Sequence, residues 1–298
     1  PIVGGCLLRA IREVLGAEVA TDAVIDAWAV AYQQLADIFI GAEEQLYQQN
    51  AAAPGGWRGA RRFRVARKVG ESDAITSFHL VPVDGGPLLD YLPGQYIGMR
   101  LLLDGEEVRR NYSLSALANG REYRISVKRE VGGRVSNHLH DNVREGDELD
   151  LFPPAGDFSL SESDKPLALI TAGVGITPAL AMLDAARHSG RPIHFIHCAR
   201  NADVHAFRDW VDAQVAEHPQ IRHYVCYSEP GAADQADATG YLSQELLEQW
   251  LPAERDLDAY FLGPKPFMAQ VKRHLQALGV PDEQSRYEFF GPASALDS

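Results

Sequence analysis

The first part of the chain has its apolar residues at helical spacing. Such residues recur every three or four positions in residues 7–15 and again in residues 24–38. This period predicts two helices between about residues 6 and 47. Trp28 and Tyr32, one helical turn apart, are expected to pack in a core rather than against a cofactor. Two helices of this length cannot enclose a core by themselves.

The helical pattern stops at a segment that contains helix breakers. Residues 48–58 include Pro54, Gly55 and Gly56 in succession, and both residue types disfavour a continuing helix. We therefore predict a two-helix segment over residues 1–50 and a linker over residues 51–61.

Beyond the linker the pattern changes to short alternating runs. Turns with Gly, Pro and Asp separate these runs, which predicts an antiparallel β-barrel over residues 62–163. A barrel of this kind can hold a cofactor on its outer face. The predicted strands are residues 63–68, 76–81, 96–101, 110–115, 123–128 and 147–152.

The remainder, residues 164–298, alternates strands with helices. Its first strand is apolar on both faces, which is typical of a parallel sheet covered by helices on both sides. The predicted fold is therefore multidomain, with an all-α segment, an antiparallel barrel and an α/β parallel-sheet domain. The predicted strands are residues 166–171, 192–197, 221–227 and 258–262, and the helices are residues 178–186, 205–217, 243–250 and 266–278.

Charge and cysteine content narrow the class of protein. With 28 basic and 41 acidic residues the formal net charge is −13, which argues against nucleic acid and anionic membrane surfaces as partners. Three separated cysteines form no disulfide framework, zinc spacing or all-thiolate iron–sulfur site, which favours a reduced cytoplasmic setting. No apolar run reaches membrane-spanning length, so we expect no membrane insertion. The chain begins at Pro1 without Met, and we expect a segment upstream of it.

The run that contains Arg110, Tyr112 and Ser113 carries candidate chemistry in the barrel. Alternate side chains of a strand share a face, so a guanidinium and an aromatic ring can meet one ligand. This arrangement suits a flavin nucleotide, although an exposed arginine on a half-buried strand explains the same residues. Residues 132–137, expected to form a turn, offer a place for a pyrophosphate, which favours FAD over FMN.

Two turns carry candidate chemistry in the parallel-sheet domain. Gly173 and Gly175 follow a strand and precede a helix, so a pyrophosphate can approach the N–H groups of the helix. The full Gly-x-Gly-x-x-Gly pattern is absent because Pro178 stands at the third glycine position. Residues 262–268 form a second strand-to-helix turn, and both turns are expected at one crevice. They predict a nucleotide site, with a simple tight turn as the alternative.

Five motifs follow one another along the chain. They are Arg110-Asn111-Tyr112-Ser113, Gly132-Gly133-Arg134-Val135-Ser136-Asn137, residues 173–178, Gly263-Pro264 and Tyr287-Glu288-Phe289-Phe290-Gly291-Pro292. In this order they resemble the ferredoxin–NADP reductase-like superfamily and, within it, the flavohemoproteins, which are bacterial nitric oxide dioxygenases. The two N-terminal helices look like the last two helices of that family's globin domain. The resemblance covers essentially all 298 residues.

The resemblance implies roles for individual residues. Phe290 is expected against the isoalloxazine where nicotinamide enters, and Glu43 is expected to orient the proximal histidine of a heme. We assign both to catalysis. The other implied FAD-site residues are Tyr96, Arg110, Asn111, Tyr112, Ser113, Val135 and Ser136, with Phe289, Gly291 and Pro292 from the C-terminal motif. The implied NAD(P)H-site residues are Gly173, Val174, Gly175, Ile176, Thr177, Pro178, Gly263 and Pro264.

The implied activity joins a reductase to a heme. Hydride would pass from NAD(P)H to FAD, and electrons would then reach a heme b at which nitric oxide and dioxygen become nitrate. The family's proximal histidine would lie upstream of Pro1, so we expect this chain to retain the NAD(P)H:FAD reductase half. Leu262 stands where the family usually has Cys, which bears on the rate of hydride transfer rather than on the fold.

Two other functions remain open at this point. A reductase component would pass electrons to a separate oxygenase or acceptor, although that class often carries an iron–sulfur domain for which the cysteines are too few. A non-enzymatic nucleotide-sensing module would bind nucleotide without redox turnover. A visible flavin spectrum with dye reduction excludes the sensor.

Several residues with potential chemistry are interpreted as structural. His138 and His140 are two positions apart but lack a third nearby ligand, so we expect no metal site there. Arg200, just after the second strand of the parallel-sheet domain, is either solvated or a partner for a 2′-phosphate. The other histidines interpreted as structural are His194, His197 and His205.

Overall fold

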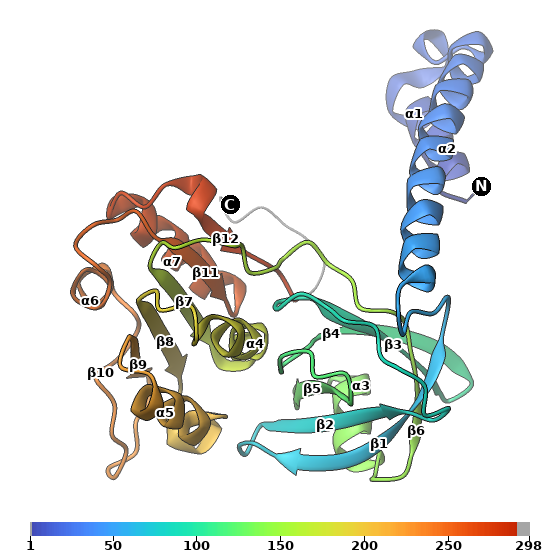
Figure 1. Ribbon diagram of the computed structural model, residues 1–298. Coiled ribbons are helices and arrows are strands. Elements are labelled where there is room, and N and C mark those ends of the chain that lie inside the picture. Colours follow the sequence, from blue (N-terminus) through green and yellow to red (C-terminus); the bar gives the residue numbers. More distant parts are fainter. Residues whose placement is uncertain (1, 291–298) are drawn as a thin grey trace. The chain divides into compact units, whose positions relative to one another are not determined.

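The computed structural model describes residues 2–290 (Figure 1). Gly291 and Pro292, which the resemblance assigns to the FAD site, lie outside the described residues. The chain divides into two compact units, Pro1–Arg58 and Gly59–Ser298. The second unit contains both sheets.

The first unit is a pair of helices, α1 (Ile2–Val19) and α2 (Asp22–Ala52). Gly4 of α1 lies against the ring of Tyr32, where an added Cβ would come within 2.7 Å of a ring carbon. A pair of helices has too little surface to bury both apolar faces. Among the described residues of this unit, the buried ones are Gly4 and Ala20.

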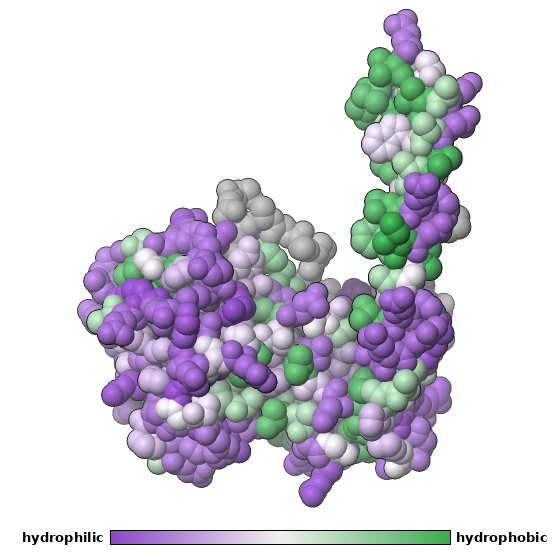
Figure 2. Space-filling model, turned by 45° about the horizontal axis from the view of Figure 1, so that its top comes forward, coloured by the Kyte–Doolittle hydropathy of each residue, from purple (hydrophilic) through white to green (hydrophobic). Residues whose placement is uncertain are grey.

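Two expectations for this unit are wrong. Trp28 is 50% exposed rather than packed in a core, because within residues 2–58 α1 and α2 have no third helix or strand to cover that face of α2. Large apolar side chains therefore remain at the surface of the pair, as the green atoms of Figure 2 show. The helix also continues to Ala52 instead of ending near residue 47, so the first two residues of the predicted linker are helical. Pro54 and Gly55 follow directly, where the helix ends.

The first sheet is antiparallel and has six strands in the order β4-β3-β6-β1-β2-β5. Its edges meet where Leu114, just after β4, forms an isolated bridge with Ile125 of β5, so the sheet closes into the predicted barrel. Buried residues such as Phe63, Phe78 and Tyr123 fill its interior. The strands are β1 (Arg61–Gly70), β2 (Ile75–Pro82), β3 (Tyr96–Leu103), β4 (Glu106–Ser113), β5 (Tyr123–Lys128) and β6 (Glu148–Leu151).

The barrel contains one helix that the sequence interpretation missed. Residues 132–137 were expected to form a turn, but residues from Arg134 onward belong to α3 (Arg134–Asp141). Val135 and Leu139, one helical turn apart, are buried beneath α3. Lys68 of β1 donates hydrogen bonds to the carbonyls of Leu139, His140 and Val143 at the helix C-terminus, at 3.1, 2.6 and 2.7 Å. The Lys68 ammonium therefore caps the C-terminus of α3 and attaches this helix to β1.

The second sheet has the strand order β10-β9-β8-β7-β11-β12, and its neighbouring strands pair in parallel, which confirms the predicted α/β class. Helices α4 and α5 cover one face and α6 and α7 the other (Figure 1). The strands are β7 (Leu167–Ala172), β8 (Ile193–Ala199), β9 (Ile221–Tyr227), β10 (Ala238–Thr239), β11 (Asp258–Leu262) and β12 (Ser285–Tyr287). The helices are α4 (Ile176–Ala186), α5 (Arg208–Glu217), α6 (Gln244–Trp250) and α7 (Lys265–Ala277), with short 3₁₀ turns η1 (Gly173–Gly175), η2 (Ala202–Val204) and η3 (Asp282–Gln284).

Candidate functional site

A cavity of about 590 Å³ lies at the carboxyl edge of the parallel sheet. We call it the sheet-edge cavity. Gly173 and Val174 after β7, Arg200 after β8 and Pro264 after β11 contribute to its wall. Ligands of open parallel sheets bind in this kind of crevice. The sequence prediction that the two strand-to-helix turns share one crevice agrees with this arrangement.

The two turns touch each other closely enough to require glycine. A Cβ added at Gly175 would collide with the Leu262 carbonyl and would lie 2.8 Å from the Gly263 nitrogen. A Cβ at Gly263 would lie 2.7 Å from the Phe267 ring and 2.9 Å from the Ala172 Cβ. Since such distances are below contact, the missing side chains let β7 and β11 deliver both turns to one edge. Backbone N–H groups at this edge are available to a pyrophosphate.

A second cavity, of about 300 Å³, lies between the barrel and the turn after β7. We call it the barrel cavity. Arg110, Tyr112 and Ser113 of β4 line it together with Phe290. Burial raises the pKa of the Tyr112 phenol to about 12, so its hydroxyl stays protonated and can donate a hydrogen bond at neutral pH. An aromatic ring, a guanidinium and hydroxyls thus meet around one space.

The N-terminus of α3 opens into the barrel cavity. Val135 and Ser136 line the cavity, and the N-cap Gly133 offers no side-chain cap to the first amides of the helix. The Glu130 amide donates to Ser136 Oγ at 3.1 Å, which fixes the loop that enters the helix. A helix N-terminus with an arginine nearby is a favourable site for phosphate. The polar groups therefore fit the pyrophosphate of a dinucleotide such as FAD.

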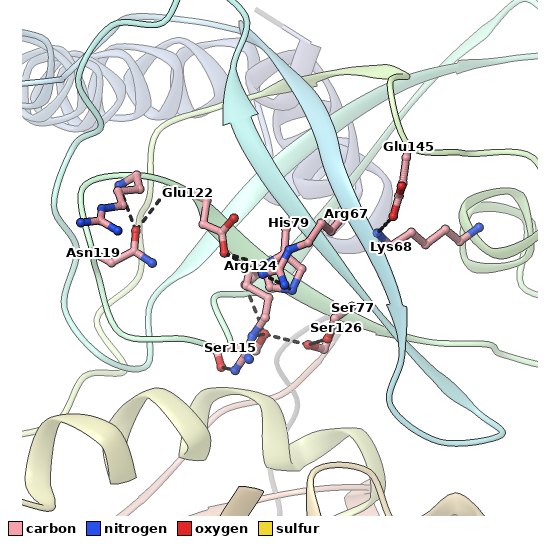
Figure 3. A network of polar contacts seen from close by, with 11 residues as sticks. Arg67, Lys68, Ser77, His79, Ser115, Asn119, Glu122, Arg124, Ser126 and Glu145 are labelled. Carbon is pink, nitrogen blue, oxygen red and sulfur yellow. Dashed lines mark hydrogen bonds and ion pairs between the residues drawn. The ribbon is translucent and has the colours of Figure 1, made fainter.

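A hydroxyl network supports the floor of the barrel cavity (Figure 3). Ser126, a cavity residue, has its Oγ 2.8 Å from Ser77 Oγ and 2.7 Å from Ser115 Oγ. The Arg124 guanidinium donates to Ser115 Oγ at 3.1 Å and to the Ser115 carbonyl. Because each of these hydroxyls has a partner, the network connects β2, β5 and the segment just after β4 beside the cavity.

Val174 and Lys128 line both cavities, so the two spaces adjoin. Val174 follows β7, and Lys128 ends β5, where its ammonium donates to Glu130 at 2.7 Å. A ligand in the barrel cavity and a second ligand in the sheet-edge cavity would therefore meet at these residues. This is the geometry that transfer between two bound nucleotides requires.

Tyr96 and Glu288 line a neighbouring cavity with Gly156 and Asp157. The Tyr96 ring lies against Gly156, where an added Cβ would come within 2.9 Å of the ring. Burial, with a contribution from the Asp157 charge, raises the pKa of Glu288 to about 7. Perturbed carboxyls of this kind are concentrated at functional sites.

Glu288→Gln is expected to stabilise the protein at high pH and not at low pH. The folded-state pKa of about 7 lies above the reference 4.5, so the folded protein holds a proton that the unfolded chain has lost between these values. Stability is therefore lost as pH rises through this window, and the glutamine variant avoids that loss. Thermal unfolding of both proteins at pH 8 and at pH 4.5 measures the difference. The exposed Glu283 gives a matched control, and equal gains for both variants at pH 8 would contradict the assignment.

The structure brings most of the site residues inferred from sequence to these cavities. Four inferred NAD(P)H-site residues do not line these cavities: Gly175, Ile176, Pro178 and Gly263. The first three are buried, and Ile176 packs in the core beneath α4. Phe289 packs edge-on against Tyr287, with ring centroids 5.8 Å apart. Glu43 is exposed on α2. The inferred residues at the barrel cavity are Arg110, Asn111, Tyr112, Ser113, Val135, Ser136, Val174, Thr177 and Phe290, and those at the sheet-edge cavity are Gly173, Val174 and Pro264.

The histidines interpreted as structural make hydrogen bonds within the domains. His140 Nε2 lies 2.8 Å from the Val127 carbonyl, and His194 Nδ1 lies 2.6 Å from the Trp250 carbonyl. His197 and His205 bond to the hydroxyls of Thr171 and Tyr227, each at 2.8 Å. Within residues 2–290, no group of three or more His, Cys, Asp or Glu side chains could hold a metal ion.

Sequence reasoning missed several cavity residues. Ser126 and Lys128 belong to the barrel cavity, and Cys198, Cys226 and Tyr241 to the sheet-edge cavity. Lys128 ends the predicted strand 123–128, but nothing in the pattern of that strand indicated a position between two cavities. Arg200, left open as a solvated residue or a phosphate partner, is exposed and lines the sheet-edge cavity.

Comparisons with known proteins agree with this division of chemistry. Residues 62–160 match the oxidoreductase FAD-binding domain family, and residues 169–273 match the oxidoreductase NAD-binding domain family. No helix in the described part of the chain is both long and apolar enough to span a bilayer.

Individual proteins are similar to this chain over most of its length, beyond the two matched domains. A flavohemoprotein of Pseudomonas aeruginosa is 72% identical over the whole of this chain, which spans 76% of that relative. The crystal structure of the flavohem-like FAD/NAD-binding domain of nitric oxide dioxygenase from Vibrio cholerae is 42% identical, with TM-score 0.73, over 79% of this chain and 100% of that one. A flavohemoglobin of Malassezia yamatoensis with bound FAD and heme shares the fold at 24% identity, with TM-score 0.82, over 96% of this chain and 73% of that one.

The two sheets, their adjoining cavities and the matched domains define an FAD-dependent NAD(P)H oxidoreductase. The relatives are specific enough to go further. The chain belongs to the flavohemoprotein family and comprises its reductase half. These relatives do not favour the hypothesis of a reductase component that serves a separate acceptor. The matched oxidoreductase domains do not favour a nucleotide-sensing module without redox activity.

Proposed function

We propose that the chain transfers reducing equivalents from NAD(P)H in the sheet-edge cavity to FAD in the barrel cavity. The observation that carries the proposal is the pair of adjoining cavities, which share Val174 and Lys128. When bound, FAD accepts a hydride and releases electrons one at a time. The chain's own residues would bind and orient the two nucleotides and exclude water from the contact between them.

The proposed FAD-site roles follow from chemistry and position. Arg110 and the N-terminus of α3 would hold the pyrophosphate, since the N-cap Gly133 makes no side-chain hydrogen bond to the first amides of this helix. Tyr112 and Ser113 would contact the flavin ring system, and Tyr96 would lie beside it. Each of these roles places a polar or aromatic group against the part of FAD that it suits.

The proposed NAD(P)H-site roles centre on the two glycine turns. Amides around Gly173 and Gly175 would face the pyrophosphate, and Pro264, directly after Gly263, would complete the wall. The close packing of Gly175 on Leu262 and Gly263 supports this role, since it fixes both turns. Leu262, which replaces the family's usual Cys, is fully buried and contributes its carbonyl to that packing.

We propose that residues 1–50 are the end of a globin domain, followed by a linker over residues 51–61, an FAD domain over residues 62–163 and an NAD(P) domain over residues 164–298. Fold likeness to the Malassezia flavohemoglobin supports the globin assignment, because a match over 96% of the chain extends into the helical pair. The exposed apolar side chains of Trp28, Leu35 and Ile38 also fit helices that pack against further globin helices.

We propose that in a complete flavohemoprotein this reductase half serves a heme that converts nitric oxide and dioxygen to nitrate, in the cytoplasm. The names of the relatives support this activity. Residues 1–58 contain no histidine, so the helical pair itself supplies no imidazole ligand for heme iron. Glu43 would orient such a histidine from outside this segment. No step at the heme follows from the described residues.

The chain as given is expected to reduce an artificial acceptor with NAD(P)H but to consume little nitric oxide. Helices α1 and α2 would form only part of a heme pocket and carry no histidine, so they should hold heme weakly. Joining the upstream globin segment of the Pseudomonas aeruginosa relative to the N-terminus should restore a Soret band and nitrate production. Stoichiometric heme with rapid nitric oxide consumption by the 298-residue chain itself would refute the proposal.

Phe290→Ser is expected to change the rate of flavin reduction or the NADH-to-NADPH ratio. Phe290 is 47% exposed at the barrel cavity, so its ring can cover the flavin and must move before nicotinamide enters. Aromatic stacking contributes roughly 0.5–1.5 kcal/mol, so we expect about a two- to tenfold change. Stopped-flow reduction measures it, with substitution of the exposed Leu102 of β3, Leu102→Ser, as the control. Parental rates with both nucleotides would argue against the gating role.

A further inference from the structure

Cys198 and Cys226 are neighbours on adjacent parallel strands. Cys198 of β8 pairs in register with Cys226 of β9, so both side chains project from the same face of the sheet. Cys226 is buried in the core under α6 and α7, and Cys198 packs against the same core. Both thiols are free. Parallel strands lie about 4.8 Å apart, which is within the range of Cα separations that a disulfide spans.

The two thiol groups interact directly. A hydrogen bond to Cys226, together with burial, raises the pKa of Cys198, and the same hydrogen bond lowers the pKa of Cys226. Cys226 also donates to the Gly240 carbonyl at 3.3 Å. The Cys226 sulfur is therefore the more readily ionised of the two and the better nucleophile.

The thiol pair also forms part of the wall of the sheet-edge cavity. Cys198 precedes Ala199 and Arg200, whose carbonyls accept from the Ser228 and Glu229 amides at 3.0 and 2.8 Å. These bonds hold the ends of β8 and β9 together at the cavity. A covalent change at the sulfurs would therefore act on the wall of the cavity itself.

We propose that Cys198 and Cys226 form a reversible disulfide when exposed to a hydroperoxide, and that this disulfide weakens NAD(P)H binding. The effect on NAD(P)H rests on the proposed function, but formation of the disulfide does not. The Cys226 thiolate attacks one oxygen of hydrogen peroxide and becomes a sulfenic acid as the O–O bond breaks, and the departing hydroxide takes up the proton that the thiol lost to give water. The Cys198 sulfur then attacks Cys226, the S–S bond forms and a second water leaves. Overall, two thiols are oxidised and one hydrogen peroxide is reduced to two waters.

The disulfide would change the cavity for two reasons. Side chains that stand in register on parallel strands have Cβ atoms nearly one strand spacing apart, farther than the roughly 3.8 Å that a relaxed disulfide prefers. The ends of β8 and β9 must therefore shift, which also makes the bond easily reduced. Oxidation also removes the thiol donor to Gly240, whose neighbour Tyr241 lines the cavity.

The test treats the FAD-loaded 298-residue chain with hydrogen peroxide and then with dithiothreitol. Oxidation should reduce the titratable thiols from three to one, and peptide mapping should find Cys198 linked to Cys226. The KM for NADH should rise by about tenfold, which corresponds to roughly 1.4 kcal/mol of lost binding, and should recover on reduction. Bound NADH should slow the oxidation, because it would cover the cavity wall.

Three variants make the result decisive. Cys6→Ser, on the exposed helical pair, should respond to peroxide as the parent does, whereas Cys198→Ser and Cys226→Ser should show no reversible rise in KM. Absence of the linked peptide at doses that oxidise Cys6 would overturn the proposal. A linked peptide with unchanged KM would overturn its regulatory effect. The Gly175→Ala variant described below tests separately whether this cavity binds the nucleotide.

Discussion

Replacing Arg110 with alanine is expected to remove most of the FAD from the purified protein. Arg110 and the N-terminus of α3 both line the barrel cavity, and together they are its proposed phosphate-binding groups. Loss of one charge-assisted hydrogen bond costs roughly 1.5–3 kcal/mol, so FAD affinity should fall on the order of tenfold to a hundredfold. Flavin content after gel filtration and titration of the apoprotein with FAD measure the loss.

Arg109→Ala is the matched control for this experiment. Arg109 is the preceding residue of β4, and its side chain is engaged elsewhere, with Glu107 at 2.7 Å and over the Phe152 ring. Removing it deletes the same charge from the same strand without touching the cavity. Equal flavin content in the parent and Arg110→Ala, or equal losses in both variants, would show that the phosphate assignment is wrong.

Gly175→Ala is expected to impair the use of NAD(P)H while FAD stays bound. The added methyl group would collide with the Leu262 carbonyl and the Gly263 nitrogen, which are backbone atoms that cannot rotate away. Overpacking of this kind costs about 1–3 kcal/mol, and the turn must shift to relieve it. The KM for NADH should then rise by about tenfold or more. Steady-state reduction of a dye, with flavin content measured on the same sample, checks both parts.

Gly70→Ala provides the comparison for Gly175→Ala. Gly70 ends β1, and an added Cβ there would meet no atom within 4 Å, so the same substitution should leave turnover unchanged. A Gly175→Ala protein with parental KM and rate would contradict the role of the β7 turn. Loss of FAD from that variant would point to general unfolding instead.

The sequence predicted those elements whose apolar residues repeat over several turns or strands. Strand β9 (Ile221–Tyr227) begins and ends at the predicted residues, and β11 (Asp258–Leu262) does too. Helix α3 was missed because its apolar residues within eight positions are few, and Gly132 and Gly133 before it suggested a turn. Strands as short as β10 and β12 contain too few residues for a period to appear.

The candidate site could be predicted only in part, because several of its features depend on contacts between residues that are distant in sequence. Gly173 and Gly175 could be proposed as site residues because their strand–turn–helix setting is local in sequence. The perturbed pKa of Glu288 depends on burial and on Asp157, a residue distant in sequence, so no local pattern could indicate it. The pairing of Cys198 with Cys226 depends on the register of β8 and β9, which a sequence read alone does not fix.

The central claim is that this chain passes reducing equivalents from NAD(P)H to a bound flavin. Anaerobic addition of NADH or NADPH to the FAD-loaded chain, followed in the visible spectrum, tests it most directly. The account predicts that the flavin bands bleach with at least one of the two nucleotides and return when air is admitted. Bands that stay unchanged with both nucleotides, in a protein that is folded and holds stoichiometric FAD, would contradict the account.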